Sequence, residues 1–196
     1  MYTEVLADGS LLLDTSIGEE WKRPDRFCRH IVSGGQTGAD RAALDFAIQH
    51  HGYTHGGWAP NGRTAEDGPI PLKYQLVELD GGYRQRTKRN IEDSDGTLVL
   101  NLGELTDGSL LTLQYAERIG KPAIAIQLEG SDAESQACEV LKWLEANRIQ
   151  VVNVAGPREG KRPGVYAHAM AILKMLDAVN CRQRHGPNGS TGIEGG

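Results

Sequence analysis

Residues 30–41 read His-Ile-Val-Ser-Gly-Gly-Gln-Thr-Gly-Ala-Asp-Arg, which is the pattern of a strand, a tight loop and the start of a helix. The β-type run from Cys28 to Ser33 predicts the strand, and a helical pattern continues from Ala39 through Ile48. Glycines allow positive φ angles and close approach to a ligand, and the first turn of a helix presents unpaired N–H groups. The loop therefore predicts an anion site, with phosphate as the natural ligand. The alternative is a merely compact connection between strand and helix.

The loop matches neither of the common nucleotide-binding signatures. No Gly-Lys-Ser/Thr closes it, so it is not a P-loop, and Gly-Gly-x-x-Gly differs from the dinucleotide fingerprint. The pattern thus indicates phosphate but names no nucleotide.

Composition limits the classes of function. The chain has 196 residues and a net charge of −5, which disfavours a general nucleic-acid binder. Its three cysteines form no disulfide or zinc pattern, and His50, His51 and His55 complete no metal site, so we expect free thiols and no metal. No apolar run approaches the ~20 residues of a membrane span, and the acidic N-terminal segment is unlike a signal peptide. We therefore expect a soluble, cytoplasmic protein that binds no membrane.

Apolar runs alternate with helical patterns along the chain, which predicts a three-layer α/β/α sandwich with a mainly parallel sheet. We expect this domain to span residues 27–182. Residues 1–26 form an extension with a small β-hairpin around Asp8 and Gly9, and residues 183–196 read as a disordered tail. The expected strands after the first are 55–58, 75–79, 97–102, 123–128 and 149–154, and the expected helices are 83–93, 110–119, 133–147 and 165–179.

Four glycine-rich loops should meet at one edge of this sheet, because ligands bind outside the carboxyl ends of parallel strands. The loops are 33–40, 60–68, 103–109 and 155–164. Three of them supply an arginine in or just after the loop, namely Arg41, Arg63 and Arg158. Their convergence predicts an anion pocket.

Acidic residues form a second set of candidates in these loops. Asp40, Glu66 and Asp67 could orient sugar hydroxyls, bind Mg²⁺ or act in acid–base catalysis. Alternatively they cap helices or pair with nearby arginines. Asp93 and Asp95 precede a strand, so we expect them at its amino end, away from the pocket.

Four ordered motifs resemble those of the molybdenum cofactor carrier family, the circularly permuted YpsA-like branch of the SLOG superfamily. They are SGGQTGADRAALD (33–45), GRTAEDG (62–68), RTKRNIEDSDGT (86–97) and NVAGPR (153–158). The resemblance covers roughly residues 29–179. It implies a Rossmann-like fold related to the LOG proteins, a homo-oligomer, and a phosphorylated pterin or nucleotide-like ligand.

The resemblance also assigns roles to individual residues. Residues 34–38 would take the phosphate-loop role, and residues 107–110 would match the second glycine-rich loop. LOG phosphoribohydrolases carry a catalytic glutamate after this second loop, and here that position falls on Thr112. Glycosidic cleavage needs a carboxylate, so the departure counts against hydrolysis.

Three functions follow from these observations. The first is a carrier that binds molybdenum cofactor or a nucleotide, with Mg²⁺ compatible but not required. The second is a LOG-like nucleotide hydrolase in which Asp40, Glu66 or Asp67 replaces the glutamate, and the third is an oligomeric protein whose glycine loops only pack. No catalytic residue is assigned. The expected ligand-binding residues are Gly34, Gly35, Gln36, Thr37, Gly38, Asp40, Arg41, Arg63, Glu66, Asp67, Gly108, Ser109 and Arg158.

Overall fold

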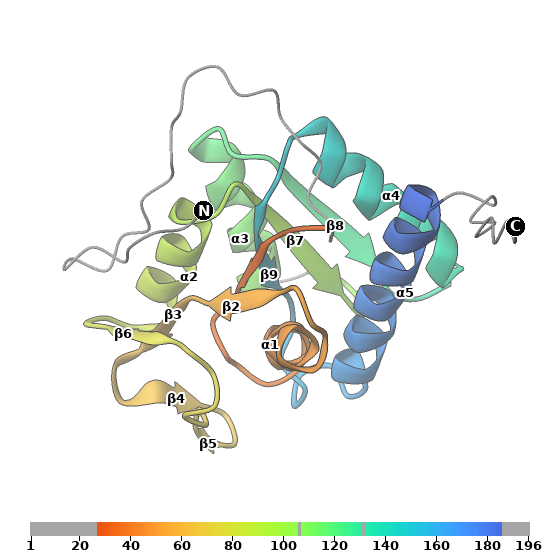
Figure 1. The fold of residues 1–196 in the computed structure, drawn as a ribbon. Helices are drawn as coiled ribbons and strands as arrows, with labels where there is room; N and C mark the ends of the chain where they lie inside the picture. The colour runs from red at the N-terminus through yellow and green to blue at the C-terminus, as the bar shows by residue number, and fades with distance from the viewer. Residues whose placement is uncertain (1–26, 106, 131, 186–196) are drawn as a thin grey trace, which may run out of the picture.

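The computed structural model describes residues 27–105, 107–130 and 132–185 and is built around a five-stranded parallel sheet (Figure 1). The strand order is β2-β1-β9-β7-β8, and every neighbouring pair is parallel. This confirms the expected α/β sandwich. The strands are β1 (His30–Val32), β2 (Thr54–Gly56), β7 (Gly96–Asn101), β8 (Ala123–Gln127) and β9 (Val151–Ala155).

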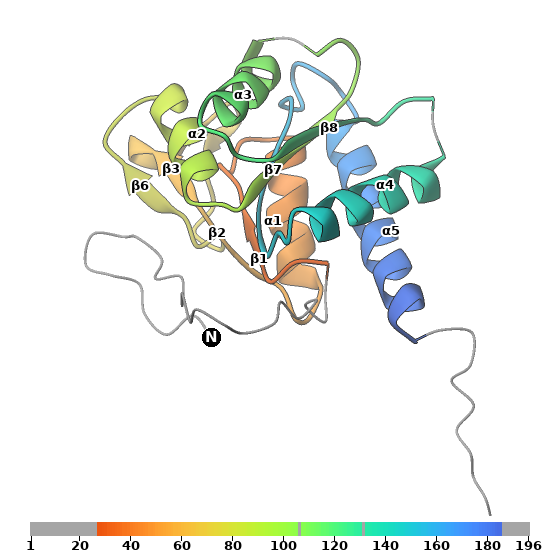
Figure 2. The same cartoon turned by 90° about the horizontal axis from the view of Figure 1, so that it is seen from above.

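Helices cover both faces of this sheet (Figure 2). Helices α1, α4 and α5 pack against one another on one side, and α2 and α3 pack together on the other. The main apolar core lies between the sheet and the first group, where Phe46, Leu141 and Leu173 are fully buried or nearly so. The helices are α1 (Ala39–Gln49), α2 (Tyr83–Glu92), α3 (Asp107–Arg118), α4 (Ala133–Ala146) and α5 (Val165–His185).

The expected strand 55–58 is divided in the structure at Gly57. Residues 54–56 join the main sheet as β2, whereas β3 (Trp58–Pro60) turns away and pairs with β6 (Val77–Leu79). Gly57 has a φ of 129°, and a Cβ there would lie 2.3 Å from the Ser33 carbonyl oxygen. The backbone thus leaves the sheet at a position that only glycine fills easily.

The segment that contains the expected loop 60–68 has structure of its own. It contains the short helix η1 (Asn61–Arg63) and an antiparallel hairpin of β4 (Thr64–Ala65) and β5 (Gly68–Pro69). A second apolar cluster lies beneath this excursion, formed by Leu44, Ala59, Ile70, Tyr74 and Leu76. The segment from β3 to β6 is therefore a small packed unit beside the main sheet.

Two helix boundaries differ from the sequence expectation. Helix α3 starts at Asp107, so Gly108 and Ser109 lie in its first turn and not in a loop. Helix α5 continues to His185, three residues into the segment expected as a tail. The expected hairpin in residues 1–26 and the segment 186–196 lie outside the described residues. Within the described ranges, no helix combines the length and apolarity that crossing a membrane requires.

Candidate functional site

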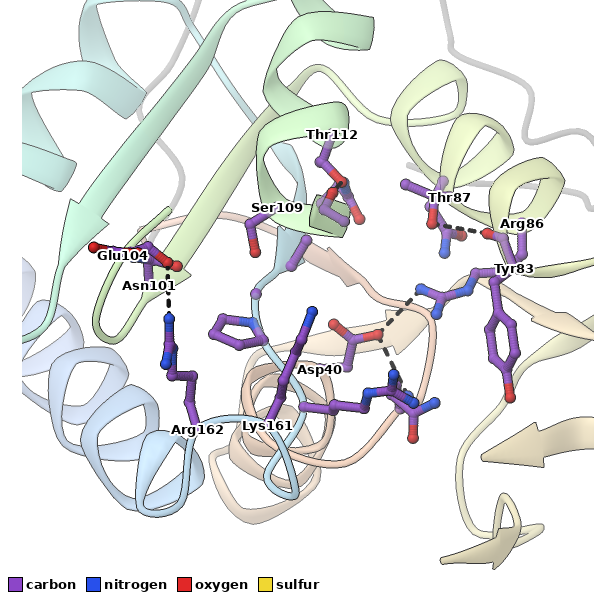
Figure 3. Close-up of a pocket in the computed structure, with 18 residues that line it drawn as sticks. Asp40, Tyr83, Arg86, Thr87, Asn101, Glu104, Ser109, Thr112, Lys161 and Arg162 are labelled. Atoms are coloured by element: carbon purple, nitrogen blue, oxygen red, sulfur yellow. Dashed lines mark hydrogen bonds and ion pairs between the residues drawn. The ribbon is translucent and has the colours of Figure 1, made fainter. Parts of the chain in front are cut away.

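A cavity of about 290 Å³ opens at the carboxyl ends of β1, β9 and β7, the three central strands (Figure 3). Three of the four expected loops contribute to its lining, and helix α2 takes the place of the fourth. Its size lies near the lower end of the ~300–1,000 Å³ usual for small-molecule sites. The expected residues that line it are Gln36, Asp40, Gly108, Ser109 and Arg158.

Arg86 from α2 and Asp40 from α1 meet inside this cavity (Figure 3). Arg86 Nη1 donates to Asp40 Oδ2 at 3.1 Å, and the two residues are only 9% and 3% exposed. Arg86 Nε is buried and has no hydrogen-bond partner among the described residues. Because an unsatisfied buried donor costs about 1–3 kcal/mol, a bound acceptor is the natural partner for this N–H.

Gly34 provides the space that Arg86 occupies. A Cβ at Gly34 would lie 1.6 Å from Arg86 Nη1 and 2.1 Å from Cζ. Gly38 has a φ of 79°, and its Cβ would lie 2.4 Å from the Pro157 carbonyl oxygen, so this glycine lets two loops approach each other. Neither glycine is part of the cavity wall, and the same holds for Gly35. These glycines therefore act indirectly: they leave room for neighbouring groups and do not line the cavity themselves.

Asp40 is a carboxyl group in an unusual environment. Burial raises its pKa, and Arg86 together with the Gln36 N–H, 3.3 Å from Oδ2, opposes that rise only in part. A carboxyl group that holds its proton more readily is suited to acid–base chemistry. Of the three carboxylates considered as replacements for the missing glutamate, Asp40 is the one that lines the cavity.

The cavity is lined by more positive than negative charge, although the chain as a whole is acidic. The loop after β9 brings three basic side chains to it, and Arg162 Nη2 donates to the Glu104 carbonyl oxygen at 3.4 Å. Nearby charges dominate because salt screens exposed charges beyond about 8–10 Å. The four cationic lining residues are Arg86, Arg158, Lys161 and Arg162, and the two acidic ones are Asp40 and Glu104.

The first turn of α3 forms another wall of the cavity through Gly108, Ser109 and Thr112. Backbone N–H groups in a first helical turn lack intrahelical partners and carry a partial positive charge, which favours anions. The Thr112 hydroxyl donates to the Gly108 carbonyl oxygen at 2.7 Å. At Thr112, the position that the resemblance aligned with the glutamate of LOG phosphoribohydrolases, this wall therefore presents a hydroxyl group that is hydrogen-bonded within its own helix.

Arg63 lies outside the cavity wall, contrary to its expected role in binding. Its guanidinium donates to four backbone carbonyl oxygens at 2.9–3.0 Å, those of Ile70, Pro71, Tyr74 and Leu76. This arginine therefore holds the excursion between β3 and β6 together.

Four further expected residues lie beside the cavity and do not line it, namely Thr37, Arg41, Glu66 and Asp67. Arg41 pairs with Asp67 through two hydrogen bonds of 2.5 and 2.8 Å. The Thr37 hydroxyl donates to Glu66 Oε1. The alternative considered from the sequence, pairing with arginines, thus holds for Asp67 with Arg41 as it does for Asp40 with Arg86.

Several lining residues were not singled out from the sequence. Arg86 begins the third family motif and Asn153 begins the fourth, so those motifs were the available signal. Asn153 is 2% exposed, and its Nδ2 donates to Thr97 Oγ1 at 3.3 Å. Asp95 directly precedes β7, at the amino end of that strand as expected, and its Oδ2 accepts from the Gln150 and Val151 N–H groups at the start of β9.

No group of three or more His, Cys, Asp or Glu side chains in the described ranges could hold a metal ion. Cys28, Cys138 and Cys181 take part in no disulfide within the described part of the chain.

Comparisons with known proteins agree with this architecture. A sequence model of the circularly permutated YpsA SLOG family matches residues 31–176. The crystal structure of a protein named "Putative molybdenum carrier protein", from Syntrophus aciditrophicus SB, is similar with a TM-score of 0.74 and 47% sequence identity. The similarity covers 77% of this chain and 96% of that one. The comparison with curated proteins gives no match.

Proposed function

The chain belongs to the circularly permutated YpsA SLOG family, and from this premise we propose that its cavity binds a small phosphorylated ligand. The observation that carries the proposal is the buried Arg86, whose Nε lacks an acceptor among the described residues. A phosphate oxygen would satisfy this N–H, and the N-terminal turn of α3 would supply further donors. Arg158 and Lys161 add positive charge to the same cavity.

The more specific proposal is that the protein carries molybdenum cofactor, a pterin that bears a phosphate. The similar protein from Syntrophus aciditrophicus has a name that refers to a molybdenum carrier. The cationic side chains suit the phosphate, and the buried Asn153 amide suits the polar edge of a pterin or purine ring. In this reading Gln36, Asp40, Arg86, Ser109 and Arg158 contact the ligand, while Gly34, Gly35 and Gly38 shape the loops around it.

The second candidate is a nucleotide hydrolase, and one observation favours it. Asp40 has a raised pKa inside the cavity and could act as a general acid or base. The hydroxyl of Thr112, in place of a carboxylate, favours the carrier instead. We therefore rank binding above turnover.

Retention of the cofactor tests the carrier proposal. Molybdenum cofactor released from a molybdoenzyme is mixed with the wild-type protein and passed through a desalting column, and molybdenum is measured in the protein fraction. We expect co-elution with the wild type and loss of it in Arg86→Gln. Arg84→Gln is the matched control, because Arg84 is an exposed arginine of the same helix that does not line the cavity. Equal retention by all three proteins would contradict the proposal.

A turnover assay separates the two candidates. Adenosine 5′-monophosphate and other nucleoside monophosphates are incubated with the protein, with and without Mg²⁺, and release of the free base is followed by chromatography. We expect no release above the buffer control. Release that disappears in Asp40→Asn would instead support the hydrolase.

Assembly into a homo-oligomer remains a proposal, supported by apolar surface on α3. Leu110 and Leu111 are 39% and 51% exposed on this helix. Light scattering at several protein concentrations measures the mass, and we expect a multiple of the monomer.

A further inference from the structure

The hairpin of β4 and β5 lies beside the cavity. Its residue Glu66 contacts two of the loops that line the cavity. The Glu66 N–H donates to Gln36 Oε1 at 3.0 Å. Glu66 Oε1 accepts from the Gly160 N–H at 2.9 Å and from the Thr37 hydroxyl. Its other carboxylate oxygen is 3.7 Å from Arg158 Nε. One residue thus connects the loop after β1 with the loop after β9.

Two of the residues that Glu66 contacts line the cavity, namely Gln36 and Arg158. The Gln36 amide oxygen accepts a second hydrogen bond from the Thr37 N–H at 3.0 Å, so two backbone donors fix its orientation. The Arg158 side chain is half exposed, and the 3.7 Å between its Nε and Glu66 Oε2 is too long for a strong hydrogen bond. The positive charge of Arg158 therefore stays accessible from the cavity. Glu66 itself does not line the cavity.

The loop after β9 is shaped to receive this carboxylate. A Cβ at Gly160 would lie 2.8 Å from Glu66 Oε2. Partial burial raises the pKa of Glu66, but the Thr37 hydroxyl, the Gly160 N–H and Arg158 outweigh it and lower the pKa overall. The carboxylate is therefore ionised at neutral pH and accepts these hydrogen bonds with a full charge.

We propose that Glu66 is a positioning residue for the ligand site: from an exposed hairpin it holds Gln36 and the loop carrying Arg158 in the arrangement that binds the ligand. The inference rests on the proposed function, because it assumes a phosphorylated ligand in the cavity. It departs from a direct role, since Glu66 does not line the cavity: its backbone N–H holds Gln36, and its side chain holds the loop that carries Arg158, which is the contact that a substitution removes. Ligand affinity then depends on a side chain outside the cavity.

Calorimetry with adenosine 5′-monophosphate as the probe tests this role. We expect Glu66→Ala to weaken binding about tenfold, the loss that follows from roughly 1.4 kcal/mol. Glu66→Gln should bind with intermediate affinity, because its amide oxygen can still accept from the Gly160 N–H. The control is Glu78→Ala, which removes a carboxylate that accepts from the Gly62 N–H at 2.7 Å in the same small unit and does not line the cavity. It should bind within twofold of the wild type.

Hydrogen exchange of the Gly160 amide provides a readout that needs no ligand. We expect faster exchange in Glu66→Ala than in the wild type or Glu78→Ala, because this N–H loses its acceptor. Circular dichroism confirms folding, and Glu66→Gln serves if the alanine variant does not fold. If the wild type binds the probe and both Glu66 variants bind equally well, the positioning role is wrong. If the wild type binds neither this probe nor inorganic phosphate, the proposed function is wrong, and unchanged exchange at Gly160 would then refute the positioning role separately.

Discussion

Replacing Gly34 by alanine should disable the ligand site although Gly34 itself does not line the cavity. The new Cβ would lie 1.6 Å from Arg86 Nη1, and real Cβ contacts below 3.0 Å essentially never occur, so the guanidinium must leave its place. The Arg86–Asp40 ion pair is then lost, and the guanidinium leaves its place in the cavity lining. Losing one charge-assisted hydrogen bond of about 1.5–3 kcal/mol weakens binding roughly 10–150-fold.

The same substitution should lower stability, because it leaves Asp40 buried without its partner. Breaking a buried pair in this way costs about 3–5 kcal/mol, and we expect the lower end because the carboxyl group can take up a proton. For a domain of this size, a loss of about 3 kcal/mol lowers Tm by roughly 6–12 °C. The matched control is Gly82→Ala at the start of α2, where a Cβ would meet only Gln85 Oε1 at 3.6 Å.

The loss of stability should depend on pH with a defined sign. The pKa of Asp40 is raised in the folded protein, so its favourable contribution is present below the unfolded pKa of about 3.9 and is lost as the pH rises through the folded value. Without Arg86 the folded pKa rises further. The difference in Tm between wild type and Gly34→Ala should therefore be small near pH 4 and larger at pH 7.

Thermal unfolding followed by circular dichroism at both pH values, together with calorimetric titration of adenosine 5′-monophosphate, provides the measurements. The reasoning is refuted if Gly34→Ala binds the probe as tightly as Gly82→Ala does. It is also refuted if the loss in Tm is the same for the two variants.

The remaining predictions concern residues around the site. Arg63→Met should lower the free energy of unfolding by about 2–3 kcal/mol, because four carbonyl oxygens lose their donor, while probe affinity stays within twofold; urea denaturation and calorimetry measure the two effects. A weaker affinity for the probe in Arg63→Met would mean that Arg63 contributes to ligand binding after all. Raising the salt concentration from 0.05 to 0.5 M should weaken probe binding several-fold, because cationic side chains attract the anion, and salt-independent binding would contradict an electrostatic site. Tyr53→Phe should lower stability by about 1–2 kcal/mol in urea denaturation, because the tyrosine hydroxyl donates to Asp177 Oδ1 at 2.5 Å; no change would mean that this partly buried hydrogen bond makes no net contribution to stability.

The strands of the sheet could be predicted because they are nearly continuous apolar runs. The expected strands 97–102, 123–128 and 149–154 lie within two residues of β7, β8 and β9 at each end. β7 and β9 are buried along nearly their whole length, so no polar alternation obscures their limits, whereas β8 is a partly exposed edge strand that is predicted from its apolar run alone. The division at Gly57 could not be predicted in the same way, because it depends on the position of the Ser33 carbonyl oxygen, just after the neighbouring strand β1.

The site was predicted in its location more than in its side chains. Gln36, Ser109 and Arg158 follow from the rule that ligands bind at the carboxyl ends of parallel strands, and they line the cavity. An arginine in a loop can equally serve a ligand or backbone carbonyl groups, and the sequence alone does not distinguish the two uses, as Arg63 demonstrates. Arg86 reaches the cavity because the excursion from β3 to β6 places α2 above the sheet, which is a tertiary effect.

The central position of β9 has a consequence for how the protein forms during synthesis. Among the strands of the described residues, β9 is the last in sequence, and it pairs with β1 on one side and β7 on the other. Until residues 151–155 leave the ribosome, β1 with β2 and β7 with β8 are two separate half-sheets with unpaired inner edges. Closing the gap requires contacts far apart in sequence, which slows folding and leaves strand edges open to aggregation. The nascent chain is therefore expected to need protection by chaperones until its last strand has joined the two halves.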